Sequence, residues 1–185
     1  DTVLVMTDQG SFSLNKDVCA AERLRPDMEL SDEQWLRIKA ESDKKDAFLK
    51  GLQYVSRRRR SAKEVRGLLA GKGFSQEATE SAVDKLARYG YVDDREYARA
   101  YMASSSGKGR LRTSFELAAK GISPELIEEF SKSSEQEYGE ALSAAKRFLK
   151  GKAPQDAKEK QRLWRHLCYR GFDQETVTKV LAELT

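Results

Sequence analysis

The stretch LAGKGFSQE at residues 69–77 decides the fold, because related stretches recur as LAAKGISPE at 117–125 and LCYRGFDQE at 167–175. In each copy a glycine follows four residues after a leucine, and an apolar residue, a serine or aspartate, and a glutamate come after it. The glycine closes one helix in the left-handed conformation, and the apolar residue folds back onto the last turn, as in a Schellman-type cap. The serine or aspartate caps the next helix, and the glutamate favours its positive N-terminus. The sequence therefore predicts the same junction between two helices three times.

A further helix is expected before each junction. Apolar residues at helical spacing predict these first helices at roughly Asp46–Ser56, Asp94–Ser105 and Glu137–Lys150. The period near 50 residues is long enough for a three-helix unit. The sequence thus predicts a mainly α fold, a tandem array of three three-helix repeats at 46–92, 93–135 and 136–185. Such an array should be elongated and curved.

The first 45 residues predict a separate extension, made of a small β-hairpin and a helix. Two short strands between Val3 and Leu14 flank a turn around Asp8-Gln9-Gly10, whose residues tolerate positive φ. A lone hairpin is marginally stable, so it should pack on a helix or pair with another strand. Ser31 and Gln34 form a capping-box pattern that starts the helix. The polar residues 41–46 are either a boundary or the solvated surface of that helix.

Composition excludes several classes of protein. Charged residues make up 35% of the 185-residue chain, against about 25% in typical domains, and the chain has three prolines. This balance indicates exposed helices rather than disorder. No apolar run approaches the ~18 residues of a membrane span. The two cysteines, Cys19 and Cys168, lie far apart and predict half-buried thiols in a reducing cytoplasm rather than a disulfide.

Charges are sorted along the repeats. The net charge of +4 divides into −4 for residues 1–44 and +8 for the remainder. Windows around the second helices (57–73, 108–120 and 158–170) hold seven, four and five basic residues against one acidic residue each. Windows around the third helices (75–89, 123–130 and 173–184) hold two, none and one basic against three acidic each. The second helices are therefore basic and the third helices acidic.

This sorting argues against a helix-turn-helix reader of DNA bases. A recognition helix needs Arg, Lys, Asn or Gln near its N-terminus, but carboxylates occupy that region here and would repel phosphate. A basic stripe along the second helices is the alternative, able to follow a phosphate backbone without reading its sequence. The competing explanation for any single basic residue is that it lies on a solvated helix face and contacts no ligand. The predicted contact residues are Arg57, Arg58, Arg59, Arg60, Lys63, Arg66, Lys108, Arg110, Arg112, Lys158, Lys160, Arg162 and Arg165. The nearby aromatics Tyr54, Trp164 and Tyr169 are expected in the core rather than stacked on bases.

No catalytic constellation can be assembled from the sequence. His166 is the only histidine, and no cysteine or histidine accompanies it at metal-ligand spacing. The Gly-Lys-Gly segments at 71–73 and 107–109 are too short for a phosphate-binding loop. Asp93 and Asp94 are expected to form a turn and cap between repeats rather than a metal pair. We therefore predict a protein that is no enzyme and uses no metal or cofactor.

Several motifs resemble the RecX family of regulatory proteins. They are SAKEVR at 61–66, KGF at 72–74, GYVDDREYA at 90–98, KGIS at 120–123, Leu126-Ile127, RGF at 170–172, Val177 and Val180-Leu181. The resemblance covers about residues 46–185, and the first 45 residues look like the N-terminal extension of longer family members. The middle repeat departs from the family's regular basic helix at Arg112-Thr113-Ser114-Phe115.

The resemblance implies a cytoplasmic, monomeric modulator of RecA, the recombinase that polymerises on single-stranded DNA. Family members bind the RecA–DNA filament within its groove and oppose filament growth, ATP hydrolysis, strand exchange and co-protease activity. DNA repair, recombination and the SOS response would be the processes affected. The expected partners are RecA, its filament, and single-stranded or double-stranded DNA. Two alternatives remain: a general, sequence-nonspecific DNA-binding protein without a RecA partner, and a protein-interaction scaffold.

Overall fold

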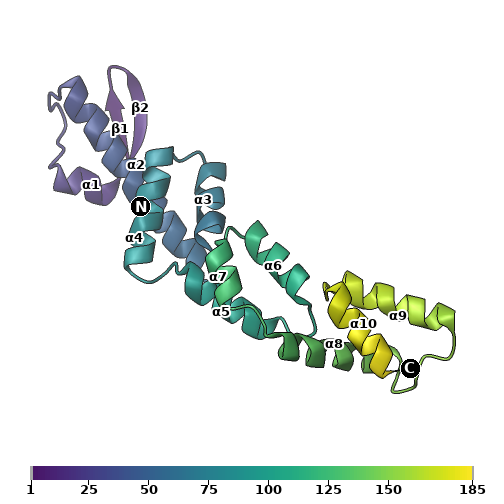
Figure 1. Ribbon diagram of the computed structural model, residues 1–185. Helices are drawn as coiled ribbons and strands as arrows, with labels where there is room; N and C mark the ends of the chain where they lie inside the picture. Colours follow the sequence, from purple (N-terminus) through teal and green to yellow (C-terminus); the bar gives the residue numbers. More distant parts are fainter. Residues whose placement is uncertain (1, 185) are drawn as a thin grey trace. The chain divides into compact units, whose positions relative to one another are not determined.

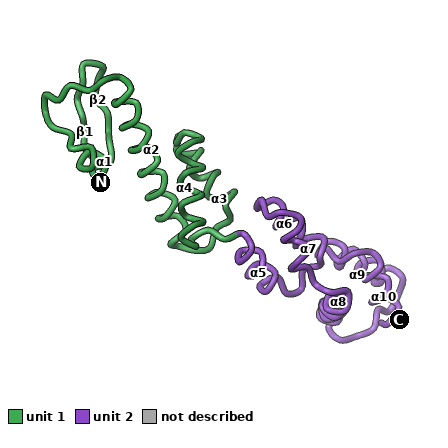
Figure 2. The backbone as a smooth tube through the Cα atoms, turned by 60° about the vertical axis from the view of Figure 1, so that its left-hand side comes forward, with its two compact units in different colours: residues 1–93 green, residues 94–185 purple. Residues whose placement is uncertain are grey.

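A computed structural model describes residues 2–184 of the chain as one β-hairpin and ten helices (Figure 1). The chain divides into two compact units, residues 1–93 and 94–185, coloured separately in Figure 2. The first unit holds the hairpin and the first three-helix repeat. The second unit holds the other two repeats. The predicted fold class is confirmed: the protein is mainly helical, with a small N-terminal hairpin and three successive three-helix groups.

The hairpin packs on a helix, as expected of an isolated two-stranded sheet. Strands β1 (Thr2–Thr7) and β2 (Gly10–Asn15) pair antiparallel, and the short helix α1 (Lys16–Ala21) follows. Leu14 is buried with Trp35 and Ile38 of the next helix. The rings of Phe12 and Trp35 meet edge to face with centroids 5.2 Å apart. This apolar contact is the core of the N-terminal extension.

Helix α2 (Asp32–Val55) joins the extension to the first repeat. The predicted capping box is present: Ser31 Oγ accepts from the Gln34 backbone, and the Gln34 side chain accepts from the Ser31 backbone. The helix continues without a break through residues 41–46. Its buried Ser42 accepts a hydrogen bond of 2.7 Å from the Asn15 backbone. The polar stretch is therefore part of a continuous helix and is largely buried or half-buried rather than solvated. The repeat boundaries stay a prediction.

The remaining helices form three small cores. Helices α3 (Ala62–Gly71) and α4 (Gln76–Arg88) complete the first repeat. Helices α5 (Asp94–Ser104), α6 (Arg110–Ala119) and α7 (Pro124–Glu129) form the second, and α8 (Ser134–Phe148), α9 (Ala157–Tyr169) and α10 (Gln174–Glu183) the third. Each core centres on a fully buried leucine of its second helix: Leu69, Leu117 and Leu167. These are the leucines that open the three recurring stretches.

The junction chemistry predicted from the sequence is confirmed in all three copies. Gly73, Gly121 and Gly171 have φ of +85°, +81° and +88°. The backbone N–H of the apolar residue that follows each glycine donates to the carbonyl of the leucine that opens the stretch, at 3.1–3.3 Å, as a Schellman cap requires. The side chains of Ser75, Ser123 and Asp173 then cap the third helices. One local solution is thus used three times.

Both cysteines are free and half-buried, as predicted. Burial raises the pKa of the Cys19 and Cys168 thiols, so they stay protonated and behave as small apolar side chains. None of the helices described is long and apolar enough to cross a membrane.

Candidate nucleic-acid interface

The four consecutive arginines of the first repeat do not lie on its second helix. That placement, implied by the window at 57–73, was wrong: residues 57–60 form the connector between α2 and α3, and α3 begins at Ala62. The helix starts later because Ser61 is its N-cap, in a capping box with Glu64. Residues 57–59 are exposed on this connector. Their charges are therefore presented by irregular backbone rather than by a helix face.

Arg60 differs from the other three arginines because it is mostly buried. Its side chain is 12% exposed, lies 3.7 Å from the carboxylate of Glu64, and covers the ring of Tyr54 at 3.9 Å. Tyr54 in turn packs against the core of the first repeat. Glu64 therefore neutralises the charge of the guanidinium, and the Tyr54 ring covers one of its faces. Arg60, although predicted as a contact residue, anchors the connector.

The two basic residues on α3 have different environments. Lys63 is exposed. Arg66 donates to both carboxylate oxygens of Glu80 on α4, at 3.0 and 2.9 Å. Part of the positive charge of the second helix is thus neutralised by the third helix of the same repeat.

In the second repeat, an acidic residue on α6 binds most of the predicted contact residues. Glu116 accepts from Lys108 at 2.7 Å and from Arg112 at 3.0 Å, and also from the hydroxyl of Tyr101. Burial raises the pKa of Glu116, but these donors outweigh it and hold the value at about 2. Lys108 lies in the connector before α6 rather than on the helix. The second repeat therefore offers little unpaired positive charge.

Arg110 joins the second repeat to the third. Its guanidinium lies 3.5 Å from both Glu137 of α8 and Asp173 at the start of α10. Its backbone N–H donates to the buried Glu137 carboxylate at 2.9 Å. Hydrogen bonding by Thr176 and then the charge of Arg110 lower the pKa of Asp173, so that carboxylate stays ionised. Arg110 is a structural residue at this junction between repeats.

The same junction brings two glycines into backbone contact. The Gly109 N–H donates to the Arg170 carbonyl at 2.9 Å, and the Leu111 N–H donates to the Gly171 carbonyl at 3.1 Å. A Cβ at Gly109 would lie 2.1 Å from the carbonyl carbon of Gly171. Only a residue without a side chain permits this approach. The α9–α10 junction therefore holds the start of α6.

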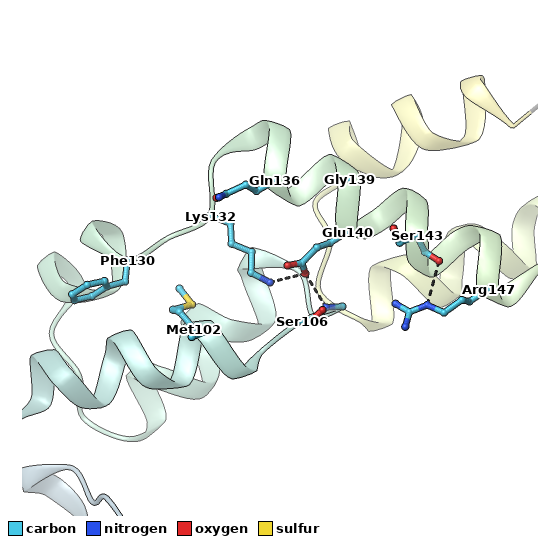
Figure 3. A pocket seen from close by; sticks show the side chains of 11 residues that line it. Met102, Ser106, Phe130, Lys132, Gln136, Gly139, Glu140, Ser143 and Arg147 are labelled. Carbon is cyan, nitrogen blue, oxygen red and sulfur yellow. Dashed lines mark hydrogen bonds and ion pairs between the residues drawn. The ribbon is translucent and has the colours of Figure 1, made fainter.

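A polar hollow of about 520 Å³ lies beside this junction, within the second unit (Figure 3). Lys132 and Glu140 point toward each other there, and their charged atoms are 2.6 Å apart. Glu140 also accepts the backbone N–H of Gly107 at 2.8 Å. The central charges of the hollow are therefore paired with each other. Across residues 2–184 no group of three potential metal ligands occurs.

The third repeat alone has the basic second helix that was predicted. Lys158, Lys160, Arg162 and Arg165 all lie on α9. Lys158, Arg162 and Arg165 are exposed, and none of the three forms an ion pair with a residue that the structure describes. We call these three the α9 cations. Arg57, Arg58 and Lys63 are likewise exposed without an ion pair among the described residues, and we call them the unit 1 cations.

Acidic side chains of the third helices are largely engaged within their own unit. Glu77 pairs with Lys44 at 2.9 Å, and Glu129 pairs with Arg95. The negative charge predicted for these helices thus serves mainly to attach them to neighbouring helices. Among the predicted contact residues, only Arg66 and Arg110 are paired with such a residue, through Glu80 and Asp173.

The expectation that Tyr169 lies in the core was wrong. Its side chain is 78% exposed at the end of α9, and Trp164 is 36% exposed, whereas Tyr54 is partly buried as expected. Arg112 reaches across from α6 and lies 5.6 Å from the centre of the Tyr169 ring. Helical spacing contained a signal that was missed, since Tyr169 follows Arg162 by seven residues and shares its face, away from the buried Leu163.

Comparison with known proteins agrees with this architecture. Family models described as the first, second and third three-helix domains of RecX match residues 47–86, 93–129 and 135–181. A relative from Bacillus licheniformis, called "Regulatory protein RecX", is 36% identical over 97% of this chain and 71% of its own length. Another of that name from Prosthecochloris aestuarii is 33% identical over 78% of this chain and 97% of its own length.

Two solved structures share the fold. One, described as the crystal structure of regulatory protein RecX, has a TM-score of 0.74 at 22% identity over 95% of this chain and 90% of its own. The crystal structure of RecX from Lactobacillus salivarius has a TM-score of 0.66 at 19% identity, and the match covers 77% of this chain and 96% of that one. Fold and surface together define a helical-repeat protein with two exposed sets of cations. The chain belongs to the RecX family of regulatory proteins.

Proposed function

We propose that this protein regulates RecA negatively, by binding the RecA–single-stranded-DNA filament. It acts in the cytoplasm as a monomer, lies in the filament groove, and limits filament growth, ATP hydrolysis, strand exchange and co-protease activity. Family membership supports the regulatory role. The observation that carries the DNA-binding part is the contrast between paired and unpaired cations among the predicted contact residues.

Of the thirteen predicted contact residues, five are engaged by carboxylates: Arg60, Arg66, Lys108, Arg110 and Arg112. A cation already bound to a carboxylate gains less from a phosphate, because the first interaction must be given up. The unit 1 cations and the α9 cations have no such partner among the described residues. We therefore assign these six residues to phosphate. Arg59 and Lys160, the other two predicted contact residues, lie beside them in sequence.

The carboxylates at the start of the third helices, which would repel phosphate, support binding without sequence preference. Ser75, Ser123 and Asp173 are committed to capping there, and glutamates follow them. A protein that follows a filament must bind any DNA sequence on which RecA assembles. Binding through phosphates meets this requirement.

The test is the single-stranded-DNA-dependent ATPase rate of RecA, measured as this protein is added at two salt concentrations. We expect inhibition at well below one molecule per RecA, and weaker inhibition at the higher salt. Two double variants, R57E with R58E and R162E with R165E, should each require a several-fold higher concentration. The matched control is R25E with R88E, which changes the net charge equally at exposed arginines outside the predicted stripe.

Two results would contradict the proposal. Inhibition that is unchanged by both double variants, with circular dichroism showing them folded, would exclude the assigned cations. A wild-type protein that binds DNA but leaves the ATPase rate unchanged would instead favour a general DNA-binding protein. Salt-independent binding to RecA alone would favour a protein-interaction scaffold.

A further inference from the structure

One face of α9 combines exposed cations with an exposed aromatic ring. Lys158, Arg162, Arg165 and Tyr169 follow one another at intervals of four, three and four residues, which places them on a single stripe of the helix. The stripe extends over roughly 16 Å at the helical rise of 1.5 Å per residue. Beside it lies a shallow groove of about 410 Å³, lined by Phe148, Arg162, Arg165, His166 and Tyr169. Charged and aromatic side chains therefore line the same groove.

The rings in this groove are held in position by neighbouring side chains. The Arg112 guanidinium lies 5.6 Å from the centre of the Tyr169 ring and donates to the Tyr169 carbonyl at 3.4 Å. Glu116 in turn holds Arg112 at 3.0 Å. Tyr169 nevertheless remains 78% exposed. An exposed tyrosine with a restrained ring can stack on a planar ligand at a smaller entropic cost than a mobile one.

Two further aromatic side chains line the groove and stack on each other. Phe148 and His166 stack with centroids 4.5 Å apart and an interplanar angle of 27°. Burial, and then the charge of Arg170, lower the pKa of His166, so its ring is neutral at neutral pH. The positive charge of the groove therefore comes from Arg162 and Arg165, while the stacked Phe148–His166 pair is uncharged.

From this arrangement we infer that the α9 groove binds the unpaired bases of single-stranded nucleic acid, with Tyr169 and the Phe148–His166 pair stacking on bases and Arg162 and Arg165 contacting phosphates. The inference rests on the proposed function for the assignment of the α9 cations to DNA, and adds base contact to it. Aromatic rings stack on any base, so such a site tolerates every sequence. In a duplex the base faces are covered by their neighbours. An acidic peptide would satisfy the arginines but leave the rings without a planar partner.

The test compares two fluorescent oligonucleotides of equal length and equal phosphate number, one of thymidine and one of abasic sites. Binding to the full chain is measured by fluorescence anisotropy. We expect the wild type to prefer the thymidine strand by about 5-fold to 150-fold, the range of aromatic stacking on one base. Y169A should lose most of this preference without changing the affinity for the abasic strand. Y169F should retain it, because the phenyl ring also stacks.

Two further variants separate the contributions. R162Q with R165Q should weaken binding of both strands alike and reduce the slope of log affinity against log salt by about 1.4, at about 0.7 per phosphate contact. Y91A is the matched control, since Tyr91 is 53% exposed but lies in the first unit. It should leave the preference for thymidine unchanged.

Each outcome bears on the inference separately from the proposed function. Equal affinity of the wild type for both strands, or an unchanged preference in Y169A, would overturn base stacking at this groove. If RecA is still inhibited in that case, the proposed function stands with phosphate contacts alone. A preference for thymidine that depends on Tyr169, together with no effect on RecA, would support the groove and overturn the proposed function. Binding to RecA but to neither strand would make this face a protein contact and overturn the inference.

Discussion

The contact between Gly109 and Gly171 leads to a sharp prediction about stability. Gly109 has a φ of −72°, which any residue adopts, so its role is to allow close approach and not an unusual backbone. A Cβ there would lie 2.1 Å from the Gly171 carbonyl carbon and 2.2 Å from its oxygen. Since both neighbours are backbone atoms, no side-chain rotation can relieve the clash. The substitution G109A must therefore move α6 away from the α9–α10 junction.

The size of the effect follows from the contacts that this movement breaks. Two backbone hydrogen bonds are lost, of Gly109 to Arg170 and of Leu111 to Gly171, at about 1 kcal/mol each. The carboxylate of Glu137, with 3% of its side chain exposed, loses the Arg110 N–H, at about 1–3 kcal/mol for a buried acceptor. Replacing glycine by alanine also lowers the conformational entropy of the unfolded chain, which offsets this loss by about 0.4–1 kcal/mol. The free energy of unfolding should fall by about 3 kcal/mol.

Urea unfolding followed by circular dichroism at 222 nm measures this change. The matched control is G139A on α8 of the same unit, where nothing lies within 4 Å of an added Cβ. That substitution should raise the free energy of unfolding by about 0.5–1 kcal/mol, because alanine favours a helix interior over glycine. The reasoning would be refuted by a G109A variant within about 1 kcal/mol of the wild type.

Three further predictions concern single residues. The lowered pKa of Glu116, about 2, contributes stability that is present above about pH 4.5 and lost as the pH falls toward 2. E116Q should therefore reduce the loss of stability between pH 6 and pH 3, measured by urea unfolding. An unchanged loss in this variant would contradict the assignment. R66A should lower the free energy of unfolding by less than about 1 kcal/mol, because its ion pair with Glu80 is exposed at 44% on both sides. The same variant should inhibit RecA as strongly as the wild type does. Clearly weaker inhibition would indicate that Arg66 contacts the filament. G73A should lower the melting temperature by several degrees, since φ of +85° costs a residue with a Cβ about 1–2 kcal/mol, whereas an unchanged value would exclude strain at this cap.

Local chemistry determined the features that the sequence alone predicted correctly. The caps at Gly73, Gly121 and Gly171 each depend on residues within a few positions of one another. The hairpin and the Ser31 capping box are equally local. Their interactions are complete before distant parts of the chain meet, so a reader of the sequence has all the participants in view.

The availability of Arg66 and Arg110 was decided only by tertiary structure, whereas the pairs Arg60–Glu64 and Arg112–Glu116 lie four residues apart on the chain. Arg66 is paired by a carboxylate 14 residues away and Arg110 by one 63 residues away. Charge counted over a window cannot include such partners, and so it assigned the same role to paired and unpaired residues. The exposure of Tyr169 depends in the same way on which side of α9 the core covers. Spacing along a helix defines its faces, but only packing against the rest of the unit determines which face stays open to a ligand.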